Sequence, residues 1–216
     1  MDVGWVQRFA DLIEERGIRI PYKIQSRVDL LLESDTIDAL VRSGLEEVWV
    51  GAESGSQHVL DAMDKGTRVE QIAEATRLLK AKGVRVGFFL QFGYPGESDA
   101  DVERTIRMVE DLMPHDIGVS ISYPLPGTPF FERVRTELGD KANWSDSDDL
   151  AMMFRGSRSP AYYKRLHRYV HHRFRTRQAL HALRGGGAGA RRVLSLAYHM
   201  PAAAVDRFRL HRILST

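Results

Sequence analysis

The chain of 216 residues is 43% hydrophobic and 28% charged with a net charge of +2, so it can bury a core and is not disordered. It contains no cysteine, which excludes disulfides, thiolate metal sites and cysteine nucleophiles. No apolar run approaches the roughly 18 residues of a membrane span, and the first residues do not form a signal peptide, so we expect a cytoplasmic protein.

Two hydrophobic periods alternate along the first part of the chain. Apolar residues three or four apart predict amphipathic helices, whereas apolar runs bounded by turn residues predict strands. Two residue pairs have the spacing of a helix start, Thr67 with Glu70 and Ser98 with Asp101. The predicted elements are helix 5–17, strand 20–27, helix 34–44, strand 48–50, helix 67–83, strand 84–92, helix 98–113, strand 117–123 and helix 129–138.

This alternation of helices and strands predicts a parallel sheet with helices packed outside it. A closed eight-stranded barrel needs about 200–250 residues, so four strands in residues 1–140 cannot form one. We therefore predict an α/β fold, an incomplete TIM-like βα barrel of about four parallel strands with outer helices. Because the pattern opens on a helix, we also expect an earlier strand of the same barrel to be missing.

Charge is distributed unequally along the chain. Residues 151–216 carry fourteen Lys or Arg and one acid, whereas residues 1–150 have a net charge of −11. Beyond a glycine-rich break we expect one or two short amphipathic pieces around Pro201. The predicted regions are a partial barrel at 1–140, a connecting loop at 141–159, and a basic helical tail at 160–216 with its break at 185–189.

Polar and turn-forming residues gather where each predicted strand ends, at 27–29, 51–56, 91–97 and 123–129. In parallel α/β folds, ligands bind at the carboxyl ends of strands. Four such endings on one rim favour a small-molecule site there, although Gly and Pro are also ordinary turn residues.

Two charged residues in these segments suit a polar ligand. Glu53 can accept two ribose hydroxyl hydrogen bonds, and Arg27 can bind a carboxylate in bidentate fashion. The alternative for Arg27 is a salt bridge to Asp29 or to another nearby acid.

Taken as an ordered series, the strand-end segments resemble the later half of the radical S-adenosylmethionine (SAM) core. They are most similar to the class that carries a cobalamin-binding domain ahead of that core. The resemblance covers roughly residues 1–174, including the continuation at 141–150. The segments that carry it are R-x-D at 27–29, GAESGS at 51–56, KGT at 65–67, FLQFGYPGES at 89–98 and SYPLPGTPF at 122–130.

The resemblance implies that SAM lies across the carboxyl ends of the strands. Glu53 and Ser54 match the residues expected near the SAM ribose and carboxylate. Arg27 and Asp29 match a pair that follows the family's third strand. The segments expected along the adenine fall on Gln91, Gly93, Tyr123, Pro124 and Leu125.

The family also holds a [4Fe–4S] cluster through a CxxxCxxC loop, and this class binds cobalamin. By resemblance both would precede Met1, and a separate chain could supply the cluster and the cobalamin domain. The implied function is a fragment of an enzyme that reductively cleaves SAM for radical chemistry, such as cobalamin-dependent methyl transfer. Without thiolates, this chain alone is expected to be inactive in that reaction.

Two other kinds of function stay open. The chain could be a SAM-binding or protein-interaction module without a cluster. It could also be an adaptor whose basic tail binds nucleic acid or an anionic membrane surface. For the tail itself we favour docking on the acidic part of the chain or on a missing domain, because opposite charges attract.

Two further groups of polar residues could suggest metal binding, but their sequence patterns argue against it. Asp146, Asp148 and Asp149 lack the Gly and distal Glu of a calcium loop, which favours a solvated acidic loop. His167 and His171 have metal-ligand spacing on a predicted helix, but no HExxH motif accompanies them. We therefore predict no metal site at either group.

Overall fold

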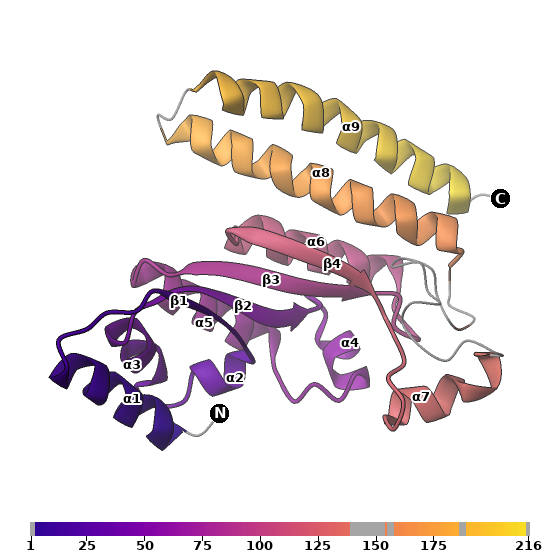
Figure 1. Ribbon diagram of the computed structural model, residues 1–216. Coiled ribbons are helices and arrows are strands. Elements are labelled where there is room, and N and C mark those ends of the chain that lie inside the picture. The colour runs from indigo at the N-terminus through magenta and orange to yellow at the C-terminus, as the bar shows by residue number, and fades with distance from the viewer. Residues whose placement is uncertain (1–2, 139–153, 155–157, 186–188, 215–216) are drawn as a thin grey trace. The chain divides into compact units, whose positions relative to one another are not determined.

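The computed structural model describes residues 3–138, 154, 158–185 and 189–214 (Figure 1). No helix in these ranges is both long enough and apolar enough to cross a membrane. The helices and strands are α1 (Val3–Glu15), β1 (Tyr22–Ser26), α2 (Val28–Leu31), α3 (Thr36–Arg42), β2 (Leu45–Glu53), α4 (Gln57–Ala62), α5 (Val69–Ala81), β3 (Arg85–Phe92), α6 (Asp99–Leu112), β4 (Asp116–Ile121), α7 (Pro129–Val134), the 3-10 helix η1 (Arg135–Glu137), α8 (Pro160–Arg184) and α9 (Ala190–Leu214).

The four strands form one parallel sheet in the order β1-β2-β3-β4. Each strand therefore neighbours the next strand along the chain, as in a segment of a βα barrel. The prediction of an α/β partial barrel with four parallel strands and helices between them is confirmed. Two short helices, α2 and α4, were not predicted, because four and six residues are too few to show a helical period.

Of the two predicted helix starts, the structure confirms one and corrects the other. Ser98 caps α6 as predicted, since its Oγ accepts the Asp101 N–H and Asp101 accepts the Ser98 N–H. The pairing of Thr67 with Glu70 is wrong, because α5 begins two residues later, at Val69. There the side chain of Gln57 accepts the Val69 N–H (3.1 Å) and thereby fixes the start of the helix.

The chain divides into two compact units. Unit 1 comprises residues 1–90 and 114–118, with helices α1 to α5, strands β1 and β2, and most of β3. Unit 2 comprises residues 91–113 and 119–216, with helices α6 to α9 and the carboxyl ends of β3 and β4. The division predicted from composition, with a loop at 141–159, stays a prediction, because most of that loop lies outside the described residues.

The two faces of β3 differ in burial. Val86, Phe88, Leu90 and Phe92 on one face are buried, whereas on the other face Arg85 is exposed and Phe89 and Gln91 are partly exposed. On one side of β2 and β3, Trp49 and Phe89 lie with ring centroids 4.9 Å apart. A Cβ at Gly87 would come within 2.4 Å of the Trp49 ring, so this glycine makes room for the indole.

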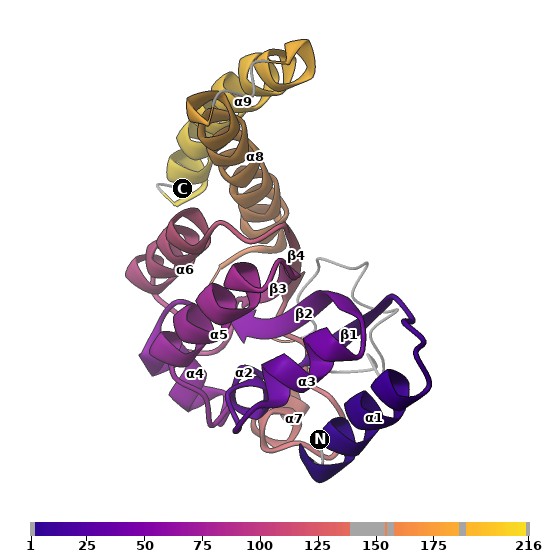
Figure 2. The same ribbon diagram turned by 90° about the vertical axis from the view of Figure 1, so that its left-hand side faces the viewer.

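In unit 2 the basic tail forms two long helices, α8 and α9, which pack against each other (Figures 1 and 2). The predicted helix at 160–184 is confirmed, and Ser159 caps it. The prediction of one or two short pieces around Pro201 is corrected, because α9 is a single helix that contains this proline. Contacts with α8 on both sides of the proline stabilise the helix. Before the proline, the Nδ1 atoms of His199 and His172 lie 2.8 Å apart, and after it Asp206 pairs with Arg165.

Helix α8 also contacts the acidic helix α6 of the same unit. Arg173 donates to both carboxylate oxygens of Glu110 (2.7 Å each), and Arg158 contacts Asp99 (3.0 Å). The Arg173 pair agrees with the expectation that the basic tail docks on acidic residues of the chain, whereas Arg158 lies just before that tail.

Candidate functional site

The carboxyl end of β1 carries an ion pair. Arg27 follows β1 directly and donates to both carboxylate oxygens of Asp29, from Nε (3.0 Å) and Nη2 (2.9 Å). Its Nη2 also donates to the backbone carbonyl of Lys65 (3.0 Å). Hydrogen bonding raises the pKa of Arg27 and lowers the pKa of Asp29. The structure therefore shows the salt-bridge alternative for Arg27, with its side chain still half exposed.

The carboxyl end of β2 carries a second ion pair. Glu53 Oε1 lies 2.7 Å from Lys65 Nζ, and the Glu53 side chain is only 14% exposed. Glu53 has a left-handed φ of 55° where the β2–β3 register shifts, and this shift re-aims the side chain. A Cβ at Gly51 would lie 2.8 Å from the same Glu53 oxygen, so the glycine leaves space for the carboxylate.

Lys65 joins these two strand ends, because its ammonium binds Glu53 and its carbonyl binds Arg27. It was not among the predicted site residues. The only signal for it in the sequence was its place in the segment Lys65-Gly66-Thr67 of the ordered series.

Ser54 has a structural position. Its side chain is fully buried, and its Oγ accepts the backbone N–H of Ser56 (3.1 Å). This hydrogen bond stabilises the turn that leads from β2 into α4. A contact between Ser54 and a ligand stays a prediction, and in the structure the hydroxyl is directed into the protein.

In unit 2, β3 ends at the partly buried Gln91 and the buried Phe92, and a tight turn follows. Gly93 has a φ of 82°, and its N–H donates to Glu97 Oε2 (2.6 Å). A Cβ at Gly93 would lie 3.0 Å from the ring of Tyr163 on α8, so only glycine fits without displacement. The turn is therefore closed by a carboxylate on one side and covered by an aromatic ring on the other.

Glu97 is the second residue that the site prediction missed. Burial raises its pKa to about 7, although the Gly93 hydrogen bond opposes this shift. Its Oε1 is buried and has no hydrogen-bond partner within the described part of the chain. Glu97 stands in the segment that carries the resemblance, but burial of an acid beside two glycines cannot be read from sequence.

The segment after β4 follows closely on the end of β3. Ser122 donates its N–H to the carbonyl of Phe92 (2.7 Å), which extends the pairing of the two strands. Of the predicted residues, Tyr123 is partly buried, Pro124 is buried and Leu125 is 58% exposed. This segment thus presents one apolar side chain, that of Leu125, to solvent, and its contact with adenine stays a prediction.

Metal-binding groups are lacking in the described ranges, where no cluster of three or more His, Asp or Glu residues could hold an ion. His167 and His171 lie with ring centroids 4.5 Å apart, and burial lowers the pKa of His167. The acidic group at 146–149 falls outside the described residues. Since the sequence has no cysteine, its donor set does not fit a thiolate-held [4Fe–4S] cluster.

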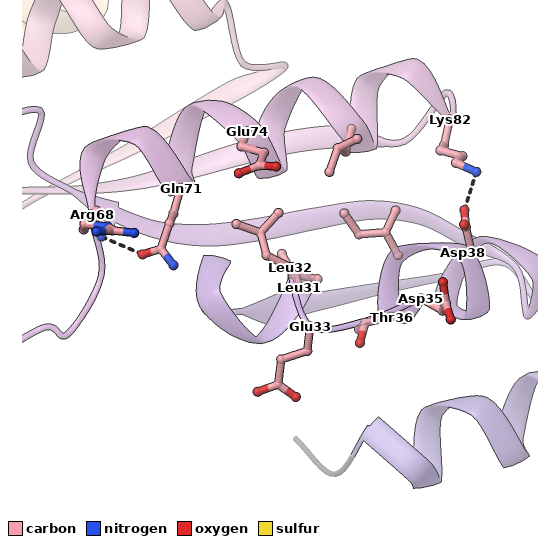
Figure 3. Close-up of a pocket in the computed structure, with 12 residues that line it drawn as sticks. Leu31, Leu32, Glu33, Asp35, Thr36, Asp38, Arg68, Gln71, Glu74 and Lys82 are labelled. Carbon is pink, nitrogen blue, oxygen red and sulfur yellow. Dashed lines mark hydrogen bonds and ion pairs between the residues drawn. The ribbon is translucent and has the colours of Figure 1, made fainter.

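A cavity of about 390 Å³ lies elsewhere in unit 1, among α2, the start of α3 and α5 (Figure 3). Part of its polar lining is paired: Lys82 contacts Asp38, and the Arg68 N–H donates to Gln71. None of the nine predicted site residues lines it. The cavity is therefore separate from the strand ends.

Comparison with known proteins gives matches to radical SAM proteins. The family profile described as the Radical SAM superfamily matches residues 6–109. An uncharacterized methyltransferase of Pyrococcus horikoshii is 31% identical over 134 residues, which are 61% of this chain and 29% of that protein. The anaerobic magnesium-protoporphyrin IX monomethyl ester cyclase of Rubrivivax gelatinosus is 29% identical over 144 residues, 65% of this chain and 25% of the cyclase.

Among solved structures, the radical SAM methyltransferase TsrM of Kitasatospora setae, with cobalamin and a [4Fe–4S] cluster bound, superposes with a TM-score of 0.53. That match has 18% identity and covers 62% of this chain and 25% of TsrM, so it shows the shared fold. This chain spans less than a third of the length of the first curated relatives it matches. The profile match and the parallel partial barrel agree, and residues 6–109 of this chain belong to the radical SAM superfamily.

Proposed function

We propose that this chain binds SAM at the carboxyl ends of its strands and forms the SAM-binding part of a radical SAM catalyst. The observation that carries the proposal is the charged network at the ends of β1 and β2, where Lys65 links Glu53 to Arg27. SAM has a cationic sulfonium, an α-amino acid group and ribose hydroxyls, so carboxylates and cations are both needed to bind it.

Each part of the network has a role in this proposal. The Glu53 carboxylate accepts hydrogen bonds from the ribose hydroxyls, while its ion pair with Lys65 holds it in place. Arg27, held by Asp29, offers its remaining N–H groups to the SAM carboxylate. In unit 2 the proposed contacts are with adenine, and the residues assigned to them are Gln91, Gly93, Tyr123, Pro124 and Leu125.

SAM cleavage needs groups that this sequence does not contain. We propose that the cluster thiolates, and a cobalamin domain if the enzyme uses one, come from polypeptide outside these 216 residues. When bound, the cluster would supply the electron that cleaves SAM; the residues described here would bind and orient the substrate. The chemistry of the whole enzyme is proposed to be methyl or alkyl transfer, because relatives of this chain are named as methyltransferases.

A second candidate is a SAM-binding or protein-interaction module that never takes part in cleavage. The absence of cysteine from the sequence favours it. A SAM-binding module and a part of a radical SAM catalyst would both bind SAM. Only SAM cleavage distinguishes them, and it can be measured only when a cysteine-bearing partner is present.

The test is calorimetric titration of the full chain with SAM, comparing Glu53→Gln with the unchanged protein. We expect binding by the unchanged chain and a Kd about tenfold or more higher for Glu53→Gln, since a hydrogen bond to a charged group contributes about 1.5–3 kcal/mol. Arg42→Met is the matched control: Arg42 pairs with Asp11 and Glu14, away from the strand ends. No SAM binding, or equal Kd values for all three proteins, would contradict the proposal.

A further inference from the structure

Helix α9 has one face turned toward α8 and one turned away. His199, Asp206 and Leu210 lie on the inner face: Asp206 and Leu210 are buried, and His199 contacts His172 of α8. These positions are four and seven residues apart, so they lie on one side of the helix. The residues half a turn away from them form the outer face.

The outer face is apolar. Leu194 is 69% exposed, Tyr198 65%, Val205 48% and Phe208 63%. Their spacings of four, seven and three residues place them in one stripe, with Pro201 between them on the same side, and the Tyr198 ring at its edge also meets His172 of α8 (ring centroids 5.7 Å apart). Four exposed apolar side chains in a single stripe exceed the scattered exposure of a soluble helix and indicate an interaction surface.

Cations flank this stripe. Residues 189–214 carry five arginines and a single acid, Asp206. That acid is buried and lies 2.7 Å from Arg165 of α8, so its charge is already balanced. The surface arginines of α9 are Arg191, Arg207, Arg209 and Arg212, whereas Arg192 stands seven residues before His199 on the inner side and donates to the Ala182 carbonyl of α8 (3.5 Å).

An apolar stripe with arginines beside it matches the chemistry of an anionic lipid surface. The apolar side chains enter the acyl boundary while the guanidinium groups contact the lipid phosphates. A nucleic acid would use the arginines but leave Leu194 and Phe208 in water. Two copies of α9 meeting at their outer faces would bring the surface arginines of one helix against those of the other, and these charges repel.

A cavity beside the stripe adds a place for a phosphate. It has a volume of about 420 Å³, and its lining includes Arg207, Phe208 and His211 of α9 together with Tyr169 and Arg173 of α8. Arg173 is balanced by Glu110, whereas no ion pair of Arg207 is found within the described part of the chain. A cation next to an exposed aromatic ring is suited to an anion that carries an apolar tail.

From these observations we propose that α9 docks on anionic membrane lipid. The helix lies in the membrane interface, with Leu194, Val205 and Phe208 inserted. Arg207 and the other surface arginines of α9 contact lipid phosphates. The interaction does not depend on SAM or on the strand ends, so it is independent of the function proposed above.

The test is co-sedimentation of the full chain with vesicles of phosphatidylcholine alone or with 30% phosphatidylglycerol. We expect binding to the anionic vesicles only, with affinity reduced by about tenfold or more in Phe208→Ser, since a buried Phe contributes about 1.5–3 kcal/mol. Arg207→Gln should weaken binding by about fivefold. Leu12→Ser, at an exposed apolar position of α1, is the control and should bind as the unchanged chain does.

Inorganic phosphate as a competitor distinguishes a lipid from a free anion. If phosphate at millimolar concentration abolishes vesicle binding and Phe208→Ser has no effect, the ligand is a soluble anion and the proposal fails. It also fails if the unchanged chain ignores anionic vesicles, or if Phe208→Ser converts a dimer to a monomer in the absence of lipid. Retained helical circular dichroism in each variant shows that the loss is not due to unfolding.

Discussion

The strand ends of unit 1 and unit 2 differ in how their polar groups are held. In unit 1 the charges lie near the surface and pair with one another, through Arg27, Glu53 and Lys65. In unit 2 the chain is fixed by a buried turn, where Gly93 is enclosed between Glu97 and Tyr163. Changes in unit 2 should therefore affect stability, whereas changes in unit 1 should affect stability little and ligand binding strongly.

The largest expected loss of stability is for Gly93→Ala. Its φ of 82° is unfavourable for alanine by about 1–2 kcal/mol, and the new methyl group would lie 3.0 Å from the buried Tyr163 ring. Overpacking adds about 1–3 kcal/mol, so we expect a total of roughly 2–5 kcal/mol in urea unfolding.

Gly127→Ala is the matched control for that change. Gly127 has nearly the same φ, 81°, but a Cβ there would meet no atom within 4 Å. Only the backbone cost remains, so the loss should be about 1–2 kcal/mol. Equal losses for the two variants would mean that Tyr163 does not enclose Gly93 as described.

Glu97 gives unit 2 a pH dependence opposite in sign to that of Glu47 in unit 1. Its pKa in the folded protein is about 7, against 4.5 in the unfolded chain, so the folded state binds the proton more tightly. Between these values the folded state holds more protons, and stability falls as pH rises. The full effect is about 3 kcal/mol, lost between pH 4.5 and 7.

Glu97→Gln removes this titration and keeps an acceptor for the Gly93 N–H. We expect the variant and the unchanged chain to have similar unfolding free energies at pH 4, and the variant to be more stable by about 3 kcal/mol at pH 8.

The pH dependence that Glu47 contributes has the opposite sign, because hydrogen bonds from Trp49, Lys23 and Arg85 lower its pKa to about 2. Its contribution is present above pH 4.5 and is lost in acid, so Glu47→Gln should reduce stability at neutral pH.

Periodicity predicted the sheet because the strands are long apolar runs between turn residues. The run at 84–92 coincides with β3 almost residue for residue. Helix starts were less predictable, since Thr67 and Glu70 have the spacing of a capping box but Gln57, ten residues earlier, decides where α5 begins. A contact between distant residues leaves no local pattern in the sequence.

The same reason limits what could be predicted of the site. Arg27 and Glu53 were identified because ligands bind at the carboxyl ends of parallel strands and their side chains suit a polar ligand, and Asp29 was identified through the resemblance. Lys65 and Glu97 were missed because their roles depend on tertiary contacts, with Glu53 in one case and with the buried turn at Gly93 in the other. Ser54 was identified by type, but its burial could not be predicted.

A small effect on stability is expected for Lys65→Met. Its side chain is about one third exposed, and the Glu53 carboxylate it leaves behind still reaches water, so we expect a loss of about 1 kcal/mol. The double variant Glu53→Gln with Lys65→Met should recover part of this loss, because no unpaired charge remains. Arg42→Met, whose partners are about half exposed, should cost less than Lys65→Met. A small stability cost for Lys65→Met together with a large loss of SAM affinity would mean that the unit 1 network serves a ligand. A loss of several kcal/mol with unchanged SAM affinity would instead make it a structural ion pair, and unit 1 would then resemble unit 2.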